Sequence, residues 1–167
     1  GNRSIHMSPH GVYRCRGEDR WISIVCRDDA EWQRLAATID SPLARDARFI
    51  TLADRREHED ELDQMVARWC EDKDRWQLTE MLQRQGIAAF PTLSTEDVVN
   101  DPHLNEREFI ERLDHPEVGV RAHAGIPWRL SNRPNGVVSP APCLGADTDH
   151  YLTECLGLTS AQIEKLR

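Results

Sequence analysis

Six carboxylates lie within residues 54–63, and carboxylates can act as nucleophiles or as general acids and bases. They are Asp54, Glu57, Glu59, Asp60, Glu61 and Asp63. The apolar residues Leu62, Met65, Val66 and Trp69 follow helical spacing, which predicts one amphipathic helix over residues 54–70 with these carboxylates on its solvent face. Exposed carboxylates keep their ordinary pKa and have no donors aimed at a developing charge. We therefore expect a solvated acidic face and no catalytic residue here.

The histidines and cysteines form no metal-ligand pattern. Separations of 12 and 8 residues between His103, His115 and His123 match no familiar metal site. The five cysteines are an odd number and include no C-x-x-C pair, which favours a reducing, cytoplasmic compartment. Cys15 and Cys26 fall on facing strands of a predicted hairpin, where buried packing is the expected role and reactivity the alternative. No metal site is predicted.

Length and charge exclude several classes of protein. The 167 residues include 21 Lys and Arg against 29 Asp and Glu, a net charge of −8. So acidic a chain lacks the cationic surface that nucleic acid requires, although Arg14, Arg16 and Arg20 could contact a small anion locally. No apolar stretch approaches the roughly 20 residues that cross a bilayer, and the first residues have no apolar core of a signal peptide. We expect neither nucleic acid nor membrane as a partner.

The patterning predicts an α+β fold, with a small antiparallel sheet of hairpins packed with several helices, then an extended connector and C-terminal helices. The expected elements are a hairpin of strands 12–16 and 21–26, a helix from Asp28 stopped by Ser41-Pro42, helices 54–70 and 74–86, an edge strand within 87–93, short helices after Ser94 and Asp101, a hairpin 109–124, and tail helices 147–156 and 159–166. The second strand is expected at the centre of the sheet because β-branched and aromatic residues dominate it.

Composition predicts three segments. Residues 126–145 contain four prolines and two glycines without periodicity, which is typical of an extended connector. We therefore expect a small α+β domain over residues 1–125, the connector over 126–145, and a helical tail over 146–167.

Six groups of short motifs follow one another along nearly the whole chain. They are Gly1-Asn2-Arg3 with Ser8–Cys15 and Asp19–Ile22; Gly86–Pro91; Asp101–Leu104 with Arg107 and Phe109; His115–Gly119; Gly125–Pro127; and Ala141–Gly145 with Thr148, Asp149 and Leu156–Leu158. Together they resemble the small domain and tail in the C-terminal part of family III CoA-transferases, the CaiB/BaiF family, which includes formyl-CoA transferase and alpha-methylacyl-CoA racemase relatives. Ala88 stands where that family usually has proline.

The resemblance implies a fragment of a larger enzyme. Family members join a large Rossmann-like domain to this smaller one, form interlocked dimers, and transfer CoA between an acyl-CoA thioester and a carboxylate. The aspartate that carries the acyl group belongs to the large domain and has no match here, so we expect this chain alone to be inactive. A fragment of an acyl-CoA racemase and a stand-alone protein-interaction module are the alternatives.

The same resemblance implies the partners. They are an acyl-CoA and a carboxylic acid in the full-length enzyme, the missing large domain, and a second copy in a homodimer. No cofactor is expected to be bound tightly, because coenzyme A enters as the thioester substrate. Trp128 in the connector, if exposed, would mark the surface that meets the large domain.

The candidate substrate-binding residues are Met7, His10 and Gly11, in the segment before the first strand. In relatives of the formyl-CoA transferase kind this segment is rich in glycine and closes over the active site. Here residues 3–11 contain a single glycine, Gly11, which reduces the expected mobility of this segment. Two interpretations stay open: the three residues line the substrate mouth, or Pro9 and Gly11 hold a turn with His10 solvated.

Overall fold

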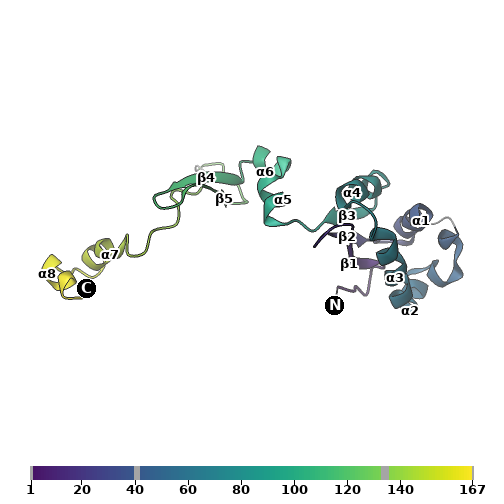
Figure 1. The fold of residues 1–167 in the computed structure, drawn as a ribbon. Helices are drawn as coiled ribbons and strands as arrows, with labels where there is room; N and C mark the ends of the chain where they lie inside the picture. Colours follow the sequence, from purple (N-terminus) through teal and green to yellow (C-terminus); the bar gives the residue numbers. More distant parts are fainter. Residues whose placement is uncertain (1, 40–41, 133–135, 167) are drawn as a thin grey trace. The chain divides into compact units, whose positions relative to one another are not determined.

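The computed structural model describes residues 2–39, 42–132 and 136–166 (Figure 1). The chain divides into two compact units, Gly1–Thr92 and Leu93–Arg167. This division falls earlier than the boundary expected at residue 125, and the three segments expected from composition stay predictions. Of the residues named above, Gly1, Ser41 and Arg167 lie outside the described part, as do residues 133–135 of the connector.

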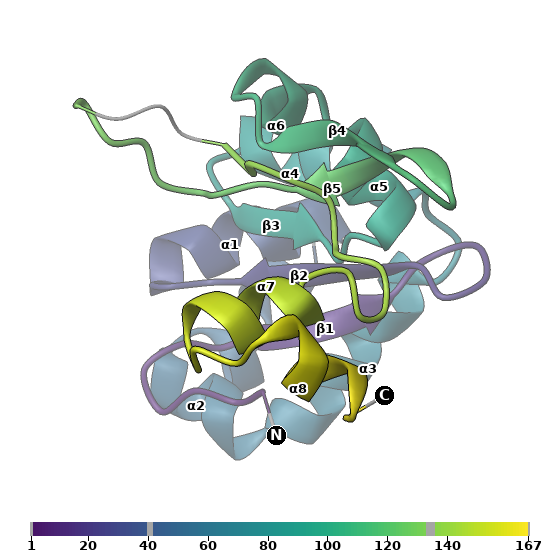
Figure 2. The same cartoon turned by 90° about the vertical axis from the view of Figure 1, so that its left-hand side faces the viewer.

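The first unit contains a three-stranded antiparallel sheet. Its strands are β1 (His10–Arg14), β2 (Trp21–Val25) and β3 (Ala88–Pro91), in the order β1-β2-β3 (Figures 1 and 2). The hairpin and the central place of β2 are confirmed, as is the edge strand that ends at Pro91. Proline fits an edge because it has no N–H to donate to a neighbouring strand. Ile22 and Ile24 alternate along β2 and are both fully buried.

Four helices and two 3-10 turns pack with this sheet. They are α1 (Asp29–Ile39), η1 (Leu43–Arg45), η2 (Ala47–Phe49), α2 (Leu52–Glu57), α3 (Glu59–Cys70) and α4 (Arg75–Arg84). The single helix predicted over 54–70 is therefore wrong, because the backbone leaves helical geometry at His58 (φ −108°, ψ 26°). Thr51 and Asp54 form a capping box that begins α2 separately. The apolar residues that predicted one helix, Leu62, Met65, Val66 and Trp69, all lie in α3, and residues 54–61 contain none, so the spacing could not reveal the break.

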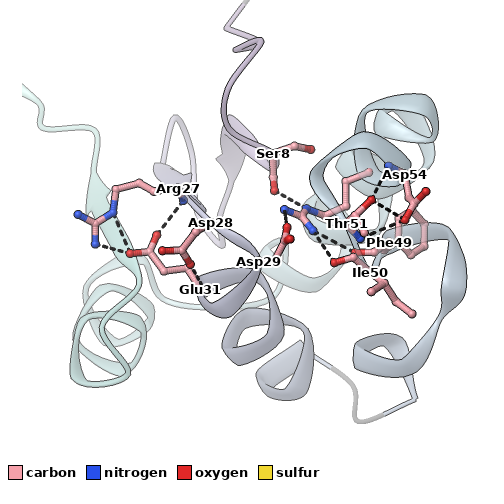
Figure 3. A network of polar contacts seen from close by, with 10 residues as sticks. Ser8, Arg27, Asp28, Asp29, Glu31, Phe49, Ile50, Thr51 and Asp54 are labelled. Carbon is pink, nitrogen blue, oxygen red and sulfur yellow. Dashed lines mark hydrogen bonds and ion pairs between the residues drawn. The ribbon is translucent and has the colours of Figure 1, made fainter.

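The helix caps follow the sequence closely, with one difference. Asp28 accepts a hydrogen bond from the Glu31 amide at 2.8 Å, as expected of an N-cap. The Glu31 carboxylate, however, accepts from the amide of Arg27 at 2.8 Å and from its guanidinium (Figure 3). Asp74 caps α4 through two amides, and Gly86 follows that helix with φ +71°.

The hydrophobic core of the first unit joins the sheet to the helices. Its fully buried members include Ile22, Ile24, Trp32, Leu35, Phe49, Leu62, Val66 and Leu82. Cys15, Cys26 and Cys70 are also buried there as free thiols, which confirms packing as the role expected for the first two. Burial raises the pKa of Cys26 and of Cys70 to about 12, so both thiols stay protonated at neutral pH.

The second unit consists of short elements. They are α5 (Thr95–Asn100), α6 (Pro102–Glu106), the antiparallel hairpin of β4 (Ile110–His115) and β5 (Gly119–Ala124), α7 (Thr148–Glu154) and α8 (Ser160–Glu164). The predicted hairpin and short helices are confirmed. Trp128 is 62% exposed. None of the helices in the described ranges combines the length and apolar character needed to span a lipid bilayer.

Candidate functional site

An open groove of about 600 Å³ lies in the first unit, between the N-terminal segment, β1 and α3. We call it the β1–α3 groove; its lining is Asn2, Arg3, His10, Gly11, Val12, Tyr13, Asp63, Gln64 and Ala67. Two of the three candidate residues, His10 and Gly11, are therefore brought together on one wall, whereas Met7 is half-buried and does not line the groove. His10 is also the first residue of β1, not part of the loop before it as expected.

Gly11 gives the aromatic ring of Tyr13 the space that it occupies. A Cβ atom added at Gly11 would lie 2.7 Å from the Tyr13 hydroxyl oxygen and 2.8 Å from its ring carbon Cζ. The two residues are two positions apart on β1, so their side chains project from the same face of the strand. Glycine is thus explained by close packing at this position.

Tyr13 ties β1 to α3. Its hydroxyl donates a hydrogen bond to Oδ1 of Asp63 at 2.8 Å, and only 4% of the residue is exposed. Burial, followed by the negative charge of Asp63, raises the pKa of Tyr13 well above its ordinary value. The hydroxyl is therefore a neutral donor that fixes the position of one Asp63 oxygen.

Arg3 brings the N-terminal segment onto the acidic side of α3. It forms an ion pair with Asp60, and its nitrogens lie 3.6 Å from a Glu59 oxygen and 3.5 Å from Oδ2 of Asp63. The hydrogen bond to Asp60 is the main cause that raises the pKa of Arg3. The solvated acidic face expected here is wrong at three positions, because Glu59 is only 9% exposed and Asp54 and Asp63 are half-buried. Both oxygens of Asp63 therefore have partners, Oδ1 in Tyr13 and Oδ2 in Arg3.

The N-terminal segment also contacts β1 directly. The Nδ1 atom of His10 forms a hydrogen bond with the backbone carbonyl of Asn2. His10 is half-buried and this contact lies at the surface, so both interpretations of the sequence stay open. The groove wall thus consists of a strand end braced by the segment that leads into it.

The remaining histidines do not assemble. His103 lies in α6 and His123 in β5. The Nδ1 atom of His115 accepts a hydrogen bond from the backbone amide of Glu117 at 3.1 Å within the β4–β5 turn. Among the described residues, no group of three or more His, Cys, Asp or Glu is placed to hold a metal ion. The chemistry available at the β1–α3 groove is binding and orientation by hydrogen bonds and ion pairs.

Sequence reasoning did not single out the other groove residues, and of these Arg3, Tyr13 and Asp63 make the contacts described above. The place of Tyr13 beside Gly11 could have been predicted, since the two residues lie two positions apart on a predicted strand and share one face. The contact of Tyr13 with Asp63 joins residues 50 positions apart, and no local spacing encodes it.

Comparison with known proteins finds relatives over nearly the whole chain. Residues 1–148 match CoA-transferase family III. The chain is 33% identical over 162 residues to a probable CoA-transferase of Mycobacterium tuberculosis, covering 95% of this chain and 20% of that protein. It is 31% identical over 168 residues to a succinyl-CoA–D-citramalate CoA-transferase of Chloroflexus aurantiacus, covering 100% of this chain and 42% of the relative.

A solved structure shows the same fold. A CaiB/BaiF family protein from Brucella suis superposes with a TM-score of 0.75 at 22% identity, over 92% of this chain and 39% of that one. The chain therefore spans well under half the length of the relatives and the solved structure described here.

Proposed function

The chain belongs to CoA-transferase family III, and from this premise we propose that it is the small-domain part of an enzyme that transfers CoA between an acyl-CoA thioester and a carboxylate. The observation that carries the proposal is the family match over residues 1–148. Its relatives include a succinyl-CoA–D-citramalate and a formyl-CoA:oxalate CoA-transferase, which favours transfer over the racemase alternative.

The reaction needs a carboxylate nucleophile that attacks the thioester in a site shielded from water. In this proposal the nucleophile belongs to the rest of the enzyme, and the chain supplies one wall of the acyl-CoA site. His10 and Gly11 form that wall at the β1–α3 groove, with Met7 in the segment leading to it. The contacts of Tyr13 and Arg3 with Asp63 hold the wall against α3.

A hybrid enzyme tests the proposal. The chain replaces the 42% of the Chloroflexus aurantiacus succinyl-CoA–D-citramalate CoA-transferase that it matches, and CoA transfer is followed by chromatography of the thioesters. We expect turnover by the hybrid and none by the chain alone. Turnover by the chain alone would place the nucleophile within it, and a hybrid that melts and assembles like the parent but stays inert would refute the assignment.

Variants of the groove wall test its residues within the hybrid. His10→Ala is expected to raise the KM for succinyl-CoA about tenfold, because a lost contact of about 1.4 kcal/mol weakens binding by that factor. His6→Ala is the matched control, since His6 lies exposed in the same segment and does not line the groove. Equal KM values for the two variants would remove His10 from the site.

A further inference from the structure

A charged side chain lies entirely inside the first unit. Arg55 of α2 is 0% exposed, although arginine is almost never fully buried without partners. Removing a guanidinium from water is costly unless each of its donors finds an acceptor. The partners of Arg55 therefore indicate what its burial accomplishes.

Arg55 joins three separate segments of chain. Its Nε donates to the carbonyl of Ser8 at 2.7 Å, and its Nη2 donates to Oδ1 of Asp29 at 2.8 Å. Its Nη1 donates to the carbonyls of Phe49 and Ile50 at 3.2 and 3.1 Å. Figure 3 labels these four partners, and dashed lines mark the hydrogen bonds. Three of the four acceptors are main-chain carbonyls, so the guanidinium holds backbone.

The Ser8 contact lies next to the groove wall. Ser8 is fully buried, and the carbonyl of the next residue, Pro9, accepts from the Cys26 amide at 3.0 Å. That bond extends the β1–β2 ladder beyond its last pair, His10 and Val25. Fixing the Ser8 carbonyl therefore fixes where β1 begins, and with it the orientation of His10.

From this geometry we infer that Arg55 is a positioning residue, which holds Ser8 so that His10 and Gly11 form the wall of the β1–α3 groove. Arg55 does not line the groove, so it acts on the groove through the residues that it holds. Its planar fork reaches all four acceptors, which a lysine ammonium cannot do with its different geometry. The effect on catalysis rests on the proposed function, whereas the positioning of Ser8 by Arg55 is a property of this chain and is independent of that function.

Amide hydrogen exchange of the full chain separates positioning from general stabilisation. The probe is the Cys26 amide, which donates to the Pro9 carbonyl, and the reference is the Thr92 amide, which donates to the carbonyl of Trp21 at the other end of β2. In Arg55→Lys, exchange of the Cys26 amide is expected to accelerate at least about tenfold more than exchange of the Thr92 amide. Arg56→Lys, the exposed neighbour in α2, is the matched control and is expected to change neither amide. Equal acceleration of both amides in Arg55→Lys would overturn the inference.

A second variant covers the case in which Arg55→Lys does not fold. Asp29 is exposed, and Asp29→Ala removes one of the four acceptors, so the Cys26 amide should exchange about threefold faster while the Thr92 amide stays unchanged. No selective change at Cys26 would then overturn the inference.

In the hybrid enzyme, Arg55→Lys is expected to raise the KM for succinyl-CoA and leave kcat within about twofold. A wild-type hybrid without turnover would refute the proposed function, and the Cys26 comparison would still decide the role of Arg55. A KM equal to that of the wild-type hybrid would contradict the inference even where Cys26 exchanges faster.

Discussion

Tyr13 and Gly11, which both line the β1–α3 groove, pack closely against each other. The ring fills the space where a Gly11 side chain would start, and the hydroxyl reaches across to Asp63 on α3. Because the ring is nearly buried, it has little room to move away from a larger residue at position 11. The packing of these two residues is therefore coupled.

Gly11→Ala is expected to destabilise the chain by about 1–3 kcal/mol, because the added methyl group forces the ring from its place. In a Tyr13→Leu background the same substitution should cost at least about 1 kcal/mol less, since the distal ring atoms are gone. Urea unfolding followed by tryptophan fluorescence measures both. Additive effects in this double-mutant cycle would contradict the coupling.

The buried thiols make stability depend on alkaline pH. Burial raises the pKa of Cys26 and Cys70 from 9.0 to about 12, and that of Tyr13 also rises. The unfolded chain therefore loses these protons at lower pH than the folded chain does. The stability that the protonated groups contribute is fully present below about pH 9 and is lost as pH rises toward 12.

We expect the free energy of unfolding to fall above pH 9 by up to about 1.4 kcal/mol per pH unit for each thiol. Cys70→Val should make the fall shallower, whereas Cys155→Ser, at an exposed position, should not. The urea midpoint measured across this pH range is the readout. A midpoint independent of pH would show that these thiols titrate alike in both states.

At the scale of elements, α2 is the helix that local signals and tertiary contacts define together. Thr51 and Asp54 begin it with a capping box, and Arg55 draws its first turn into the core. Thr51→Ala should cost about 1 kcal/mol of stability, measured by urea unfolding. Thr153→Ala, at an exposed helical position of α7, is the control and should be neutral. Equal losses in the two variants would mean that the Thr51 cap adds nothing.

Elements whose residues repeat with a clear period were predictable. The β1–β2 hairpin, α4 and the β4–β5 hairpin follow from alternation, helical spacing and turn residues. The break at His58 was not, since the apolar residues on which the single helix was based all lie in α3 and residues 54–61 contain none. The two helices separate at His58, where the backbone leaves helical geometry, and hydrophobic periodicity does not report such a change.

The candidate site was predictable to the same degree. His10 and Gly11 were found through a motif of neighbouring residues, and both line the groove. Arg3 and Asp63 were not, because their pairing joins positions 60 residues apart and depends on how α3 packs beside β1. The sequence alone therefore predicts that the charged residues of α3 face solvent, because it does not show that the N-terminal segment packs against them.

At the scale of the whole molecule, the hydrophobic core is unevenly divided. All the core residues that join the sheet and helices lie within Gly1–Thr92. In the described part of Leu93–Arg167, Ile163 alone is a buried hydrophobic residue, whereas Trp128, Leu144 and Tyr151 are exposed. Burial of apolar surface is the main source of folding free energy, so the two units should differ in independent stability.

Expressed alone, residues 1–92 are expected to unfold cooperatively in urea, with amide spectra that overlay those of the same residues in the full chain. Residues 93–167 alone are expected to lose structure gradually, because their short helices and single hairpin bury too little apolar surface to offset the entropy of ordering. Circular dichroism and two-dimensional NMR of the two pieces provide the measurement. A cooperative transition in residues 93–167 would show that this unit supports its own fold, and a disordered 1–92 would show that the core described here depends on the rest of the chain.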